Sequence, residues 1–160
     1  MPDSRCRSCG AAVKNLICEY CGSPTAGTFD LATQKEALDE YHYILQSQSE
    51  EVQIKMLRNG FLPDAEDLLI DAGVRCIPLI ELDSTAEEVP RAALWRLKAI
   101  TTKLKLMAPT ARSEQAVKEF ETLINDFDKA DRRLNLMLAV GCFVSVLVCV
   151  GGVALVVSWF

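Results

Sequence analysis

The chain has few of the side chains and motifs that enzymes use for chemistry. His42 is the only histidine among its 160 residues. The sequence contains no HExxH metalloprotease motif, no G-x-S-x-G nucleophile turn and no glycine-rich loop that could cradle a phosphate. Its acidic pairs, such as Glu50 with Glu51, are adjacent, so they point to different sides of a helix and do not share a site. We expect that this protein is not an enzyme.

Charge is absent from a long segment at the C-terminal end. No charged residue lies between Leu134 and Phe160, and the polar interruptions are Asn135, Ser145 and Ser158. About 27 helical residues at ~1.5 Å each extend ~40 Å, which exceeds the ~30 Å hydrocarbon core of a bilayer. Residues 132–160 are therefore predicted to contain a single C-terminal transmembrane helix. A buried helix of a soluble protein is the weaker alternative.

The residues that flank this segment predict its orientation. Lys129, Arg132 and Arg133 precede it, and basic residues next to a span favour the cytoplasmic side. Trp159 and Phe160 suit the opposite interface, where aromatic rings settle. The first ten residues have no apolar stretch of the kind that a signal peptide needs. We expect a tail-anchored, single-pass membrane protein with a cytoplasmic N-terminus, and a bacterial inner membrane is the favoured location.

Four of the seven cysteines form two pairs near the N-terminus. They are Cys6 with Cys9 and Cys18 with Cys21, and a glycine directly follows each pair. Two thiolates three positions apart in a tight turn can face one metal ion, and the glycines let the backbone turn toward the sulfurs. Four such ligands close a tetrahedral zinc site and leave no open position for a substrate. Disulfides are not expected, because the cytoplasm keeps thiols reduced.

This CxxCG…CxxCG arrangement resembles the short zinc ribbons found at the ends of many bacterial proteins. The resemblance covers roughly residues 4–24, and it implies a structural Zn²⁺ in a small module that serves mainly for interactions. We expect residues 1–26 to form this module, with a short hairpin at residues 12–17 between the cysteine pairs. A thioredoxin-like redox pair, a rubredoxin-type iron site and fortuitous cysteines are the weaker alternatives.

Helical patterns fill residues 27–131, which predicts a mainly α domain of about three to four helices. Thr33 and Glu36 form a capping box that predicts a helix ending at Gly60. A shorter second helix should begin at Pro63 and end before Gly73. The apolar stretch at residues 74–82 fits either a strand or a short buried helix.

Two further helices are predicted after residue 82. The third should begin at Ser84 and Thr85 and end before Pro109. The fourth should begin near Ser113 and run without a break into the transmembrane segment, because no helix-breaking residue separates them.

Charge is unevenly distributed along this helical domain. Residues 30–90 contain fourteen acidic and four basic residues, whereas residues 91–112 contain six basic residues and no acidic one. On the third predicted helix, Arg91, Lys98 and Lys105 lie along the face opposite to an apolar stripe. The strongest interpretation is that these bases offset acidic neighbours or face water. The alternatives are contact with anionic lipid of the inner leaflet and contact with nucleic acid.

Small residues recur along the predicted transmembrane helix. Gly141, Ser145, Cys149 and Gly152 are spaced by four, four and three positions, so they share one face. Such a face lets two helices approach closely in lipid, which makes it a candidate surface for a homo-oligomer. Small residues are also frequent in spanning helices that do not associate.

Together these features predict a membrane-anchored interaction or scaffold protein. The zinc ribbon and the helical domain would present a surface to an unidentified cytoplasmic protein, and the anchor would confine both to the membrane. One alternative is an oligomerising membrane effector whose transmembrane helices perturb the bilayer. Another is a membrane-tethered nucleic-acid-binding protein, which the formal net charge of −5 disfavours.

Overall fold

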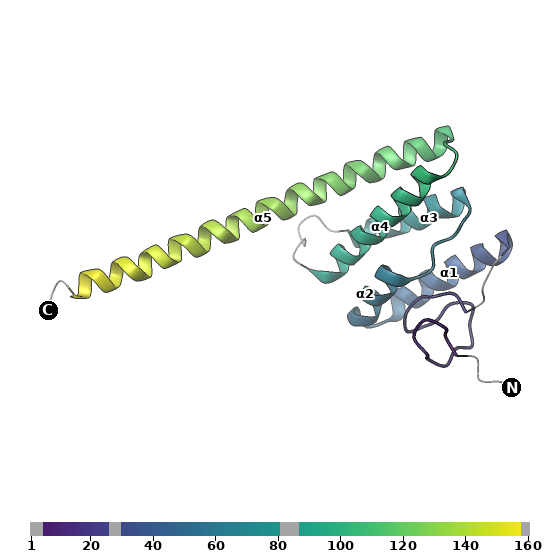
Figure 1. Ribbon diagram of the computed structural model, residues 1–160, viewed down its shortest axis with the longest axis horizontal. Helices are drawn as coiled ribbons and strands as arrows, with labels where there is room; N and C mark the ends of the chain where they lie inside the picture. Colours follow the sequence, from purple (N-terminus) through teal and green to yellow (C-terminus); the bar gives the residue numbers. More distant parts are fainter. Residues whose placement is uncertain (1–4, 26–29, 81–86, 158–160) are drawn as a thin grey trace.

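The computed structural model describes the backbone of residues 5–25, 30–80 and 87–157, and the side chains of these residues up to residue 139 (Figure 1). Within these ranges the chain forms five α-helices, one 3-10 turn and no β-strand. The prediction of a mainly helical protein is confirmed. The elements are α1 (Leu31–Ser47), α2 (Glu50–Asn59), α3 (Glu66–Cys76), η1 (Ile77–Leu79), α4 (Glu88–Leu106) and α5 (Ala111–Val157).

The first predicted helix is two helices in the structure. Asp30 caps α1 by accepting a 2.8 Å hydrogen bond from the Thr33 amide, so the prediction of Thr33 as the cap is wrong. The chain leaves the helical conformation at Gln48 and Ser49, whose backbones are extended. This break allows α2 to fold back, so that its buried face joins the same apolar core as α1. Gly60 ends α2, as predicted.

Helix α3, which corresponds to the second predicted helix, begins later and ends later than the sequence suggests. It starts at Glu66 instead of Pro63 and continues through Gly73 to Cys76. Gly73 is not a helix stop, because the ring of Phe120 on α5 lies where a side chain at this position would be. The stretch that fitted a strand or a helix is the end of α3 followed by the 3-10 turn of η1, and its last residues lie outside the described ranges.

The last two helices pack side by side and build the upper layer of the bundle (Figure 1). The predicted start of α4 at Ser84 and Thr85 falls outside the described residues. The prediction of one unbroken final helix is confirmed, because α5 runs from Ala111 to Val157. Its first part lies on α3 and α4, and the rest extends past the bundle (Figure 1).

The core of the bundle gathers around α4, which packs against α2, α3 and α5. Its largest side chains are fully or almost fully buried, and each contributes about 1.5–3 kcal/mol by leaving water. They include Leu38, Met56, Leu57, Leu69, Leu97, Ile100, Leu104 and Phe120.

The predicted transmembrane segment lies largely outside the residues whose side chains are described. This holds for all four residues of the small-residue face, namely Gly141, Ser145, Cys149 and Gly152. Among the described residues, no helix combines the length and the apolar character that a membrane span requires.

Candidate metal centre

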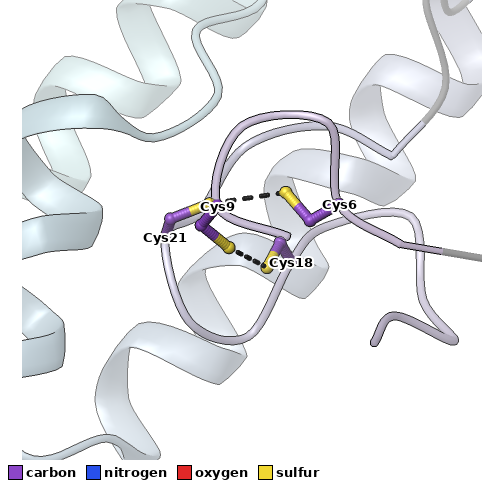
Figure 2. Close-up of side chains that lie close together, drawn as sticks. All are labelled: Cys6, Cys9, Cys18 and Cys21. Atoms are coloured by element: carbon purple, nitrogen blue, oxygen red, sulfur yellow. Dashed lines mark hydrogen bonds between the residues drawn. The ribbon is translucent and has the colours of Figure 1, made fainter. Parts of the chain in front are cut away.

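The two cysteine pairs meet in a single cluster ahead of α1. The Sγ atoms of Cys6 and Cys21 are 3.7 Å apart, and those of Cys9 and Cys18 are also 3.7 Å apart (Figure 2). All four sulfurs lie within 4.8 Å of one another. Each close contact joins one sulfur from the first pair to one from the second, so neither pair forms a site by itself.

The spacing of the sulfurs suits a four-coordinate metal ion. Four ligands at about 2.3 Å from a central zinc ion have sulfur–sulfur separations of about 3.8 Å in a regular tetrahedron. The two separations of 3.7 Å match this value, and the other pairs of sulfurs lie within 4.8 Å. Cys6 and Cys18 are buried and Cys21 is half-buried, whereas Cys9 is exposed. The cluster could therefore hold one metal ion close to the surface.

Local backbone geometry brings each pair into position. The Gly10 amide donates to the Cys6 carbonyl at 2.9 Å, and the Gly22 amide donates to the Cys18 carbonyl at 2.8 Å. Both glycines have positive φ angles, +78° and +70°, which side chains disfavour. Each pair thus occupies its own tight turn, termed here the first knuckle (residues 6–10) and the second knuckle (residues 18–22).

The prediction of a hairpin at residues 12–17 is wrong. Isolated antiparallel bridges instead join Arg5 to Ala12 and Ile17 to Pro24, so each bridge closes across one knuckle. A backbone group of residues 12–17 also bonds outside that stretch, because the Leu16 carbonyl accepts a 2.9 Å hydrogen bond from the Thr25 amide.

The thiols of the cluster have different acidities. Burial raises the pKa of Cys6, but hydrogen bonds from the amides of Cys9 and Ser8 and from Cys21 outweigh it, so the pKa falls to about 7. Burial dominates at Cys18 and raises its pKa to about 12. Because thiolates are the ligand form, Cys18 would have to release its proton to bind a metal ion at neutral pH.

The second knuckle is packed against the helical bundle. Ile17, the residue before it, is completely buried and belongs to the apolar core of the bundle. The Phe61 amide, just after α2, donates a 2.7 Å hydrogen bond to the Gly22 carbonyl. A Cβ atom on Gly22 would lie 2.8 Å from Cε2 of Tyr41 and 3.0 Å from Cα of Gly60. The knuckle therefore fits the bundle only with glycine at this position.

A buried arginine extends this contact into α4. The Arg96 side chain is 3% exposed, and its guanidinium lies 4.3 Å from the centre of the Tyr41 ring. It also donates to the Phe61 carbonyl, so the peptide groups of Phe61 connect Gly22 on one side with Arg96 on the other. Tyr41 in turn donates to the Met56 carbonyl at 2.8 Å. The cysteine cluster is thus linked to α1, α2 and α4 by buried polar contacts.

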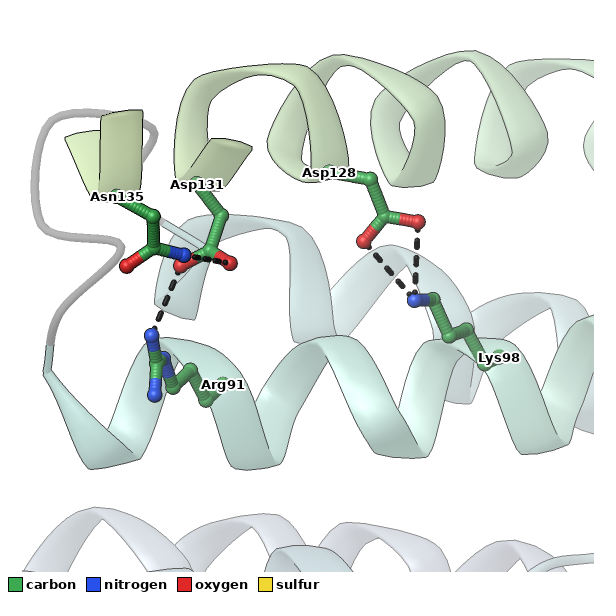
Figure 3. A network of polar contacts seen from close by, with 5 residues as sticks. All are labelled: Arg91, Lys98, Asp128, Asp131 and Asn135. Atoms are coloured by element: carbon green, nitrogen blue, oxygen red, sulfur yellow. Dashed lines mark hydrogen bonds and ion pairs between the residues drawn. The ribbon is translucent and has the colours of Figure 1, made fainter. Parts of the chain in front are cut away.

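The predicted basic face of α4 contacts α5. Arg91 pairs with Asp131 at 2.8 Å, and Lys98 pairs with Asp128 at 3.0 Å (Figure 3). Lys105 pairs with Glu121. All three predicted bases thus have carboxylate partners on α5.

No protein-family model matches this chain, and the searches of curated proteins and of solved structures also give no match.

The sequence did not clearly predict the contacts of several residues of this site. Ile17 and Gly22 read as parts of a self-contained ribbon, and only the structure shows that they contact the bundle. The carboxylates on α5 had a weak signal, because Glu121, Asp128 and Asp131 are spaced by seven and three positions and share a helix face. His42 lies on α1, away from the cysteine cluster, where it contacts Gln46 at 3.0 Å.

Proposed function

We propose that the cysteine cluster binds a structural zinc ion and that the protein is a membrane-anchored scaffold. The observation that carries this proposal is the docking of the cysteine module, residues 5–25, on the bundle, while α5 leaves the bundle in another direction (Figure 1). A module held in this way can present a fixed surface to a partner at a distance from the C-terminal end of α5.

The ligand set supports zinc. Four clustered thiolates suit zinc or an iron–sulfur centre, and harder cations such as Mg²⁺ prefer oxygen ligands. Four protein ligands leave no open coordination position, which indicates a structural role for the ion. We also propose that residues 4–24 belong to the family of short zinc ribbons.

The outer side of the module supplies a candidate contact surface. Tyr20, within the second knuckle, is 59% exposed. A shallow hollow of about 280 Å³ lies beside it, lined by residues that include Lys14, Asn15 and Glu19. Aromatic side chains with polar neighbours are typical of the residues that dominate protein interfaces. We propose that this surface binds a cytoplasmic protein.

The final helix supports the membrane anchor. Beyond the bundle, Leu136, Met137 and Leu138 are 66%, 71% and 58% exposed, so α5 offers apolar side chains with no protein cover. The uncharged run from Leu134 continues this character in the sequence. Lipid is the solvent that suits such a helix, and Arg132 and Arg133 next to the run favour a cytoplasmic bundle.

Site-specific crosslinking in membranes tests the scaffold. A photoreactive phenylalanine replaces Tyr20 in the full-length protein, and the control variant carries it at Tyr43, which is 75% exposed on α1. We expect one discrete crosslinked partner from position 20, its loss when Cys18→Ser is added, and none from position 43.

Two results would contradict the scaffold. Equal crosslinking from positions 20 and 43 would show that the module has no specific surface. Ladders of the protein with itself, unchanged by Cys18→Ser, would instead favour the bilayer-perturbing effector. That alternative is then tested by membrane depolarisation, which Gly141→Leu combined with Ser145→Leu should abolish.

A further inference from the structure

A groove on the bundle lies away from the metal cluster and from the basic face of α4. Three elements form its walls: α1, α2 and the end of α3 with η1. Its volume is about 310 Å³, at the small end of the range of ligand pockets. Apolar side chains dominate the lining, and they are Leu45, Leu57, Val74, Pro78 and Leu79.

The floor of the groove is firm. Leu45 and Leu57 belong to the buried core and are 4% and 1% exposed, so the packing of the bundle holds them in place. A second cavity below shares both leucines as lining and reaches Arg96, but its volume of about 10 Å³ admits about one water molecule. A ligand in the groove would therefore rest on apolar side chains and would not reach the buried guanidinium.

The charged side chains around the groove are paired with one another. Arg75 lies in its wall, but its guanidinium contacts Asp39 at 2.7 Å and Asp71 at 2.8 Å. Burial and the nearby Arg75 lower the pKa of His42, so its imidazole is neutral at pH 7. The other polar side chains in the lining are the amides of Gln46 and Gln53. The groove thus offers apolar area and hydrogen-bonding groups without an unpaired charge.

We propose that this groove binds a small uncharged molecule with an alkyl body and one hydrogen-bonding end, of the size of a medium-chain alcohol. An ionised head group would lose hydration without meeting an unpaired opposite charge, which disfavours fatty acids and alkylamines of the same length. This site is independent of the metal, of the crosslinking surface and of the membrane anchor.

Methyl NMR of the full-length protein in lipid nanodiscs tests the site with 1-octanol as the probe. Because octanol also partitions into lipid, titrations are compared at equal free concentration in water. We expect saturable shifts at the methyl groups of Leu45, Leu57, Val74 and Leu79. Octanoate and octylammonium, which have the same chain, should bind at least about tenfold more weakly, since each carries a charge.

A matched pair of variants shows whether the groove is the site. Val74→Trp places a large ring in the groove at a position that is 50% exposed, so the bundle should still fold. Tyr43→Phe alters α1 at a 75% exposed residue outside the groove. We expect the first variant to weaken octanol binding at least about tenfold and the second to leave it unchanged.

Three outcomes would overturn the proposal. The first is the absence of saturable shifts at the four methyl groups, with or without shifts at the exposed leucines of α5. The second is equal binding of octanol and its charged analogues. The third is a groove already filled by another part of the chain, seen as nuclear Overhauser contacts to these methyl groups without ligand.

Discussion

The cysteine module and the helical bundle are stabilised by different means. Inside the module, Cys6, Val13 and Cys18 form the buried apolar cluster, and two of these three are candidate metal ligands. So small a core cannot keep a module of this size folded without an additional crosslink. A bound metal ion is the crosslink that its side chains can provide. The bundle instead buries an extensive apolar core drawn from all its helices. One region should therefore depend on metal, and the other on packing.

The two knuckles differ in the same way. The first knuckle faces solvent, and a side chain on Gly10 would meet nothing within 4 Å. The second knuckle is docked, so Gly22 contacts Tyr41 and Gly60. The module is thus joined to the bundle through one of its two halves. A metal ion bound by both knuckles would hold the free half to the docked half.

Loss of the metal ligands should have the largest effect. Structural zinc sites contribute apparent binding free energies of about 10–16 kcal/mol, and a site with two ligands left cannot retain this. We expect Cys18→Ser with Cys21→Ser to lower the zinc content, measured by mass spectrometry, from one ion per chain to near zero. Cys76→Ala is the control, because Cys76 is also buried but belongs to the bundle core. A control that loses zinc as well would break the division between the two regions.

Truncation of the bundle core should have the next largest effect, on stability alone. Phe120 is 1% exposed and covers Gly73, so Phe120→Ala leaves a cavity that should cost about 3–5 kcal/mol of unfolding free energy. Leu106→Ala, at a residue that is 83% exposed, should change stability little. Denaturant unfolding followed by circular dichroism measures both. Zinc content should stay at one ion per folded chain in each variant.

Ile17→Ala tests the junction between the regions. The side chain is completely buried in the bundle core although it comes from the module, and its removal should cost about 2–5 kcal/mol. Val13→Ala removes a buried residue of the module's own cluster and is the matched control. We expect the first variant to lower the thermal midpoint of the bundle and the second to leave it almost unchanged. Equal effects of the two changes would mean that Ile17 does not join the regions.

Alanine at the two knuckle glycines should separate the docked half from the free half. Both substitutions place a side chain at positive φ, which costs about 1–2 kcal/mol. Gly22→Ala also forces a methyl group against Tyr41 and Gly60, and such overpacking adds about 1–3 kcal/mol. The difference in unfolding free energy between Gly22→Ala and Gly10→Ala measures the tightness of docking. Equal unfolding free energies of the two variants would contradict the docking of the second knuckle on the bundle.

Removal of an ion pair between α4 and α5 should have the smallest effect. Lys98 and Asp128 are 44% and 38% exposed, and exposed pairs contribute less than about 1 kcal/mol. A double-mutant cycle with Lys98→Ala and Asp128→Ala should give a coupling energy in this range, and salt should reduce it. A coupling of several kcal/mol would mean that these charges, and not the apolar core, hold α5 on the bundle.

Local patterns predicted the parts of the structure that short-range chemistry decides. The spacing of the cysteines and their glycines indicated the cluster, Gly60 indicated the end of α2, and the segment after Ser113 indicated one long helix. Each cysteine pair, the end of α2 and the helical stretch depend on residues that are close in the sequence, and the two pairs that meet are at most fifteen positions apart.

Contacts between distant residues explain what the sequence could not show. Gly73 looks like a helix stop until Phe120, far along the chain, is placed against it. Ile17 looks like part of a separate ribbon in the sequence. Its neighbours in the core nevertheless come from the bundle helices, which lie farther along the chain. The partners of Lys98 and Arg91 likewise lie on another helix.

Hydrogen exchange on the full-length protein, with and without a zinc chelator, tests the central claim that the second knuckle couples the metal cluster to the bundle. The claim predicts that chelation removes protection from residues 5–25 and also from the amide of Phe61, which donates the junction hydrogen bond to Gly22. Residues 92–104 and 113–130 should remain protected, because their apolar core does not include the metal ligands. Protection at Phe61 that chelation leaves unchanged would show that the module and the bundle are independent, and would contradict the account.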